Sequence, residues 1–200
     1  MARLLVFSDV HCDLDACRGL VEQAAGVDLV IGAGDFARKH DGLGRTIEAL
    51  RAIDIQTILV PGNNETDADL RAACVSWKVA TVLHGDSMEA AGLTIFGIGC
   101  GVPPLGLDWS FDLTEDQARR RLSHCPEGAD VLITHSPPHG HVDRISSGRS
   151  IGSAAVLETI ENTSPRLVVC GHVHDCWGQE SRIGASRVIN AGPRGKVVDL

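Results

Sequence analysis

The chain has 200 residues, of which 44% are hydrophobic and 22% charged, values typical of one ordinary globular domain spanning residues 1–200. Its formal charge of -8 argues against broad, non-specific nucleic-acid binding, which depends on a basic surface. No apolar stretch approaches the roughly 20 residues of a membrane span, and an acid interrupts the short N-terminal apolar run, which predicts a first strand rather than a signal peptide.

Strands and helices are predicted to alternate along the chain. In chain order, continuous aliphatic and β-branched runs predict buried strands at Leu4–Phe7, Asp28–Ile31, Gln56–Val60, Asp130–Thr134 and Arg166–Cys170. Between them, apolar residues at helical spacing predict helices at about 13–25, 43–52, 67–75, 114–123 and 153–161, with Thr114 and Ser153 as N-caps. Regions 79–98 and 180–198 alternate apolar and polar residues around glycines and predict hairpins, with Gly85-Asp86 as a turn. This order indicates an α/β protein with a mixed sheet or two packed sheets.

Each of the five predicted strands ends beside side chains that can bind a metal ion. In chain order, these ends are Asp9-Val10-His11, Gly34-Asp35, Gly62-Asn63-Asn64-Glu65, His135 and Gly171-His172-Val173-His174. Ligands of open α/β sheets bind beyond the carboxyl ends of the strands. In extended backbone, residues i and i+2 point to the same face, so Asp-x-His and His-x-His can each present two ligands to one cavity. The glycines allow the close backbone approach that such a cavity needs.

The ligand types indicate a particular chemistry. Carboxylates, imidazoles and an amide oxygen form a mixed nitrogen and oxygen set that suits Mn, Fe, Zn or similar ions. Two such ions roughly 3.5–4 Å apart can clamp an in-line displacement at phosphorus and lower the pKa of a water between them. A lone Asp-x-His is more often a turn than a ligand pair, so the prediction depends on all five ends occurring together.

In this order the motifs resemble the calcineurin-like metallophosphoesterase superfamily, whose pattern is D-x-H, GD, GNH[D/E], a single His and GH-x-H. The resemblance extends from about Leu4 to Gly192 and implies a four-layer α/β/β/α sandwich with two packed mixed sheets. It also implies two divalent metal ions, one held by Asp9, His11 and His174 and the other by Asn63, His135 and His172, with Asp35 bridging both. Residues 134–138 and 190–193 are most similar to small bacterial phosphodiesterase-like members.

One position departs from the family pattern. Asn64 stands where the family usually has a histidine that is associated with protonating the leaving oxygen. An amide can donate a hydrogen bond but cannot act as a general acid. Loss of general acid catalysis typically lowers the rate by a factor on the order of 10²–10⁴. Asp35, Asn64 and His135 are the expected catalytic positions, and phosphodiesters are expected to be preferred over alkyl phosphomonoesters.

Several residues outside the motifs are weaker candidates for substrate contact. His139 and His141 follow His135 in a proline-rich loop, and Arg149 precedes the predicted helix at 153–161, whose N-terminus can attract phosphate. Two residues within the motifs, Asn63 and Asn64, are also weak candidates for substrate contact. Each of the three loop residues has a plainer interpretation as a solvated side chain, and His40, His84 and His124 are predicted to be structural.

The sequence therefore predicts a metal-dependent phosphoric ester hydrolase that uses a metal-bridged hydroxide on a small phosphodiester or nucleotide-type substrate. The alternatives are a catalytically weak, metal-stabilised protein-binding module, or a phosphomonoesterase or nuclease of the same superfamily. Seven cysteines without CxxC pairs indicate a reducing, cytoplasmic setting rather than a secreted disulfide framework. The sequence identifies neither the native metals, for which manganese is one candidate, nor the oligomeric state.

Overall fold

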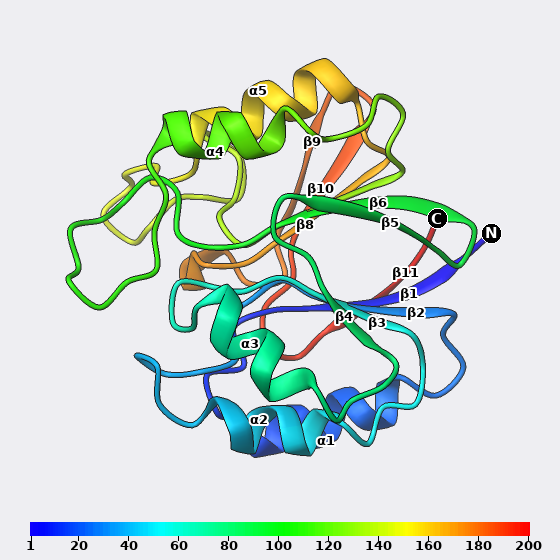
Figure 1. Ribbon diagram of the computed structural model, residues 1–200. Helices are drawn as coiled ribbons and strands as arrows, with labels where there is room; N and C mark the ends of the chain where they lie inside the picture. Colours follow the sequence, from blue (N-terminus) through cyan, green and yellow to red (C-terminus); the bar gives the residue numbers. More distant parts are fainter.

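Two mixed β-sheets packed face to face form the centre of the computed structural model, which describes residues 1–200 (Figure 1). The first sheet has the strand order β11-β1-β2-β3-β4, and the second has the order β5-β6-β7-β8-β10-β9. Helices α1, α2 and α3 cover the outer face of the first sheet, and α4 and α5 cover that of the second. The predicted four-layer α/β/β/α sandwich is confirmed.

The first sheet is parallel except at one edge. Its strands are β1 (Arg3–Phe7), β2 (Leu29–Gly32), β3 (Thr57–Leu59), β4 (Ala80–Val82) and β11 (Lys196–Asp199). β11 pairs with β1 antiparallel, with Leu4 opposite Val198. The helices on this sheet are α1 (Leu14–Gln23), α2 (Leu43–Leu50) and α3 (Asp67–Cys74). None of the helices in the chain has the length and hydropathy of a membrane span.

The second sheet has a parallel centre with an antiparallel strand at each edge. Its strands are β5 (Asp86–Ala90), β6 (Leu93–Ile98), β7 (Val131–Thr134), β8 (Leu167–Cys170), β9 (Glu180–Ile183) and β10 (Ser186–Asn190). Its helices are α4 (Glu115–Leu122) and α5 (Ala154–Thr163), and a 3-10 turn, η1, spans His174–Cys176. The predicted caps are confirmed, since Thr114 accepts the Gln117 N–H and Ser153 accepts the Val156 N–H.

Alternating side chains of the inner strands build separate cores on the two faces of each sheet. In β1, Leu4 and Val6 pack between the sheets, whereas Leu5 and Phe7 pack against the helices. All four side chains are fully buried. Burial on both faces explains why the inner strands are continuous apolar runs, and it holds the carboxyl ends of both sheets at fixed positions.

Both hairpin predictions were wrong in part. Within 79–98, β4 pairs with β3 in the first sheet, and the hairpin is formed by β5 and β6 in the second. Gly85-Asp86 is therefore a crossing between sheets, and the hairpin turn lies at Ala91-Gly92. Within 180–198, β9 and β10 form a hairpin, but β11 returns to the first sheet. An alternating pattern predicts a strand with one buried face, but it does not specify the partner strand.

Candidate metal centre

The candidate site lies at the carboxyl ends of β1, β2 and β3 of the first sheet and of β7 and β8 of the second. The loops that leave these strands bring all five predicted motifs together. Four of the predicted metal-binding residues adopt left-handed backbone conformations, with φ of 54° at Asp9, 41° at His11, 61° at Asp35 and 67° at His172. Such values are uncommon in residues other than glycine and concentrate at functional sites.

The first cluster of donor atoms comes from Asp9, His11, Asp35 and His174. One donor atom from each lies within 4.8 Å of all the others. His11 Nε2 is 3.1 Å from His174 Nε2 and 3.5 Å from Asp35 Oδ2. His174 Nε2 is 3.7 Å from Asp9 Oδ1. The four side chains thus converge on one point from three separate loops.

The second cluster comes from Asn63, His135 and His172. Asn63 Oδ1 is 3.1 Å from His135 Nε2 and 3.0 Å from His172 Nδ1, and the two ring nitrogens are 3.2 Å apart. Asp35 also faces this cluster, because its Oδ1 lies 3.4 Å from His135 Nε2. The two carboxylate oxygens of Asp35 therefore point to different clusters.

The spacing of the donors fits divalent metal ions. Nitrogen ligands lie about 2.0–2.1 Å from such an ion, so two ligands at a right angle are about 3 Å apart. The separations of 3.0–3.4 Å in the second cluster match neighbouring vertices of one coordination sphere, and those of the first cluster are looser, at 3.1–4.0 Å. The donors at this edge therefore have the spacing of metal ligands, and Asp35 lies between the two clusters.

Backbone contacts orient the ligands. The Nδ1 atoms of His11 and His135 lie 3.1 and 2.8 Å from the carbonyl oxygens of Ala37 and Ala33. Since a carbonyl only accepts, these nitrogens carry the proton, and the Nε2 lone pairs face the clusters. Asp9 accepts the backbone N–H of His172 and the hydroxyl of Ser8.

Glu65 ties two ligand loops together. Its buried carboxylate accepts backbone N–H bonds from Asp35 (2.8 Å), Gly62 (2.7 Å) and Ala37 (2.9 Å). Burial and the neighbouring charge of Asp35 raise the pKa of Glu65 to about 7. Glu65 therefore positions the loop after β2 against the loop after β3, a role that sequence analysis did not assign to it.

The glycines of the motifs allow these close contacts. A Cβ placed on Gly62 would overlap the carboxylate and backbone nitrogen of Asp35, and one on Gly171 would overlap the Asp9 carboxylate. Only a residue without a side chain fits at either position, as the sequence predicted.

Electrostatic coupling within the site is strong. Burial alone would raise the pKa of Asp35, but the positive charges of His135 and His11 hold it below its ordinary value. Burial opposes protonation of His135, yet Asp35 outweighs it and raises the pKa of His135 to about 9. Burial and the charge of His135 lower the pKa of His172 to about 3. His172 is thus a neutral ligand, whereas His135 must release a proton to bind a metal ion.

Both polar atoms of the Asn64 side chain form hydrogen bonds within the protein. Its Nδ2 donates to Asp35 Oδ2 at 2.7 Å, and its Oδ1 accepts the Lys39 backbone N–H at 2.8 Å. The backbone carbonyl oxygen of Asn64 accepts the His40 backbone N–H at 2.8 Å. Asn64 therefore joins the Asp35 carboxylate to the loop that carries Lys39.

That loop forms one wall of a cavity of about 260 Å³ beside the metal ligands. Arg38, Lys39 and Trp109 line the cavity together with His11, Asp35 and other site residues. Lys39 Nζ lies 5.4 Å from the centre of the Trp109 ring. None of these three residues was predicted from the sequence, although Arg38-Lys39 is a cationic pair that begins three positions after Asp35.

The three loop residues that were weak candidates for substrate contact lie outside this cavity. His139, His141 and Arg149 are not among the residues that line the cavity. The imidazole of His139 is 55% exposed and lies 3.9 Å from the buried Asp143 carboxylate. Arg149 is exposed in the loop before α5. None of the three forms a hydrogen bond or an ion pair with a residue of the two clusters.

Comparison with known proteins agrees with this geometry. The sequence model of the calcineurin-like phosphoesterase superfamily domain matches residues 2–199. Metallophosphoesterase domain-containing protein 1 of Homo sapiens is 31% identical over 136 residues, which cover 66% of this chain and 39% of that protein. The chain thus spans well under half the length of this curated relative.

Solved structures share the fold at low identity. The TT1561 protein of Thermus thermophilus has a TM-score of 0.78 at 18% identity, covering 96% of this chain and 90% of that one. A dimetal phosphatase of Danio rerio has a TM-score of 0.65 at 15% identity, with coverages of 96% and 88%. Because the family model matches almost every residue and the ligand motifs meet at one edge of the sandwich, the chain belongs to the calcineurin-like phosphoesterase superfamily.

Proposed function

We propose that the protein is a phosphodiesterase that binds two divalent metal ions and hydrolyses small, nucleotide-type phosphodiesters. The observation that carries this proposal is the position of Asp35, whose two oxygens face separate clusters of nitrogen and oxygen donors. When bound, two such ions supply Lewis acidity at phosphorus and lower the pKa of a water molecule between them.

The residues of the chain position the reacting groups. Asp35 and the two clusters set where the ions sit, and Asn64 holds the Asp35 carboxylate through its amide. Because an amide is not an acid at physiological pH, Asn64 does not transfer a proton to a leaving oxygen. Leaving groups that need little protonation are therefore favoured over simple alkoxides.

The cavity wall supports a phosphodiester with a flat organic group. Arg38 and Lys39 are cations beside the clusters, suited to neutralise the charge of a phosphate. Trp109 offers an aromatic face to the same cavity, on which a planar group such as a nucleobase can stack. Lys39 lies over this ring, so one residue can contact the phosphate while Trp109 contacts the ester group.

The proposal is tested with manganese-loaded protein on bis-p-nitrophenyl phosphate and p-nitrophenyl phosphate. We expect kcat/KM for the diester to exceed that for the monoester by about tenfold or more. Lys39→Ala should lower kcat/KM about tenfold without changing the metal content. Lys78→Ala, an exposed lysine remote from the cavity, is the matched control and should behave as wild type.

Two outcomes would overturn the proposal. No turnover of either ester with two ions bound would exclude hydrolysis in this form. Fewer than one ion per chain after supplementation would favour the protein-binding alternative instead.

A further inference from the structure

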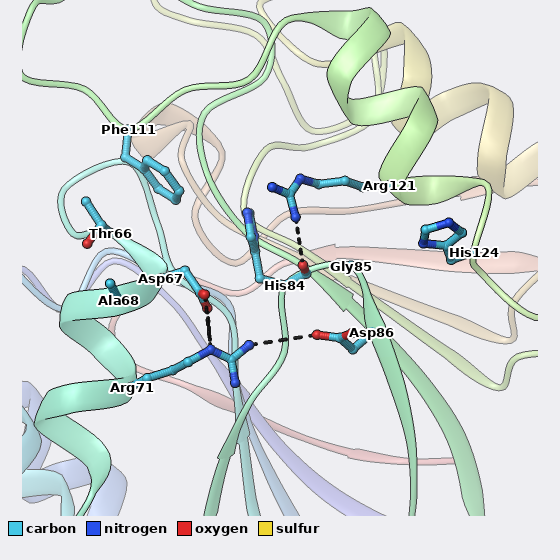
Figure 2. Close-up of a pocket in the computed structure, with 10 residues that line it drawn as sticks. All are labelled: Thr66, Asp67, Ala68, Arg71, His84, Gly85, Asp86, Phe111, Arg121 and His124. Carbon is cyan, nitrogen blue, oxygen red and sulfur yellow. Dashed lines mark hydrogen bonds and ion pairs between the residues drawn. The ribbon is translucent and has the colours of Figure 1, made fainter.

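A second polar cavity, of about 590 Å³, lies where the chain crosses between the sheets at Leu83–Gly85. Its walls come from the first turns of α3, from α4 and from the loop that carries Phe111 (Figure 2). None of its lining residues lines the cavity of the metal centre. It is therefore a separate site, and ligand binding there does not depend on the proposed phosphodiesterase activity.

His84 is the buried polar side chain at the centre of this cavity. Its Nδ1 accepts the Gly99 backbone N–H at 3.1 Å, so the proton of the neutral ring is on Nε2. The residue is only 7% exposed, and Nε2 has no hydrogen-bond partner. A buried donor without an acceptor destabilises the folded protein. Because the Nδ1 lone pair is already used, His84 presents a donor here and not a metal ligand.

Arg121 is a second donor beside His84. Its Nη1 donates to the His84 carbonyl oxygen at 3.2 Å, and it forms no ion pair with a carboxylate. The acidic residues of the cavity are paired with another arginine, since Arg71 lies 2.9 Å from Asp67 and 3.8 Å from Asp86. Figure 2 shows the His84 ring between Phe111 and the Arg121 guanidinium. An unpaired cation and an unpaired N–H donor thus adjoin the same space.

We propose that this cavity binds a small oxyanion, a carboxylate or a phosphate ester, through the Arg121 guanidinium and the Nε2–H of His84. Both groups donate hydrogen bonds and neither accepts, so an anionic oxygen is the partner that satisfies both. Nε2 is closed to water in the present conformation, and the Phe111 ring packs on His84 with centroids 5.6 Å apart. We infer that this ring turns aside when the anion enters.

The movement of Phe111 has a route to the metal centre. Its backbone N–H donates to the Asn63 carbonyl oxygen at 3.0 Å, and the neighbouring Ser110 hydroxyl accepts from the Asn63 amide at the same distance. Asn63 contributes the oxygen donor of the second cluster. Anion binding beside His84 is therefore expected to change the surroundings of one metal ligand.

Nuclear magnetic resonance of the histidine rings tests the proposal. Zinc-loaded protein labelled with nitrogen-15 is titrated separately with inorganic phosphate and with acetate, and sodium chloride controls for ionic strength. The His84 signals are assigned from their absence in His84→Phe. We expect a saturable shift of the His84 Nε2–H signal. Saturation by phosphate alone identifies a phosphate ester as the ligand, and saturation by acetate alone identifies a carboxylate.

A pair of arginine variants separates the site from general surface charge. Arg121→Gln should raise the dissociation constant about tenfold, the effect of losing one charge-assisted hydrogen bond. Arg120→Gln, the exposed neighbour on α4 that does not line the cavity, should leave the dissociation constant unchanged. No saturable shift with either anion would overturn the proposal, as would equal effects of the two variants or a shift that chloride reproduces.

Discussion

The two donor clusters of the metal centre share Asp35 but differ in their surroundings. In the first cluster the His174 side chain is 52% exposed and that of His11 is 16% exposed. In the second cluster His135 is fully buried and Asn63 is 5% exposed. The histidines of the first cluster are thus nearer to solvent than His135, although both of its carboxylates are buried.

This difference indicates different roles in assembly. In the second cluster His135 is fixed by complete burial and by its contact with the Ala33 carbonyl oxygen, so removing it disturbs the fold as well as the site. The first cluster depends on His174, which belongs to the short turn η1 and packs against the half-exposed Trp177 ring at 4.4 Å. We expect the ion at the first cluster to exchange more readily, because water reaches its ligands.

Removal of the shared ligand should have the largest effect. Asp35→Asn takes away the negative charge that faces both clusters, and several kcal/mol of transition-state stabilisation with it. We expect both ions to be lost on dialysis and turnover to fall roughly 10³-fold. Asp41→Asn, an exposed carboxylate of the same loop, is the control. If Asp35→Asn retained two ions, Asp35 would not be the bridge.

Truncation of one histidine in each cluster should separate stability from metal binding. His135→Ala leaves a buried cavity and a less compensated Asp35, so we expect the metal-free protein to lose about 2–4 kcal/mol in urea unfolding. His174→Ala should change stability by less than about 1 kcal/mol and should remove one ion. Elemental analysis and unfolding curves measure both effects. Equal destabilisation by the two variants would contradict the contrast in burial.

Most of the fold and the ligand set could be predicted from sequence because they follow local rules. Inner strands are recognisable by continuous apolar runs, and each ligand motif directly follows such a strand. The assignments of β4 and β11 could not be predicted, because strand pairing depends on tertiary packing. The hairpin expected at Gly85-Asp86 failed for the same reason.

The residues that form the cavity wall could not be predicted from sequence patterns. Trp109 meets Lys39 across 70 positions of the chain, and no motif connects the two loops. His40 and His84 both showed no supporting neighbours in the sequence. In the structure His40 Nε2 contacts the Trp109 carbonyl oxygen at 2.5 Å, and His84 is central to the second cavity. Their surroundings come from long-range contacts, which periodicity does not encode.

The buried cluster should also give the metal-free protein a characteristic pH dependence. The pKa of His135 is raised from 6.5 to about 9 in the folded state, so its stabilising contribution is complete below pH 6.5. It is lost as the pH rises through about 9, by at most roughly 3 kcal/mol. Chemical unfolding between pH 6.5 and 9.5 should show this decrease, and His135→Gln should flatten it. His174→Gln should leave the pH dependence of stability unchanged in this range, because burial lowers the pKa of His174 below 6.5.

The smallest expected effect concerns Ser8, which supports the Asp9 carboxylate of the first cluster. The buried Ser8 hydroxyl donates to Asp9 Oδ2 and accepts the Gly192 N–H at 3.0 Å, so it fixes one carboxylate of the first cluster. Ser8→Ala removes this contact without touching the second cluster. We expect the affinity for one ion to fall about tenfold, with little change for the other. Competition with a coloured chelator resolves the two binding steps. Equal weakening of both would mean that the clusters do not assemble independently, because a change confined to Asp9 would then have reached His135 through Asp35.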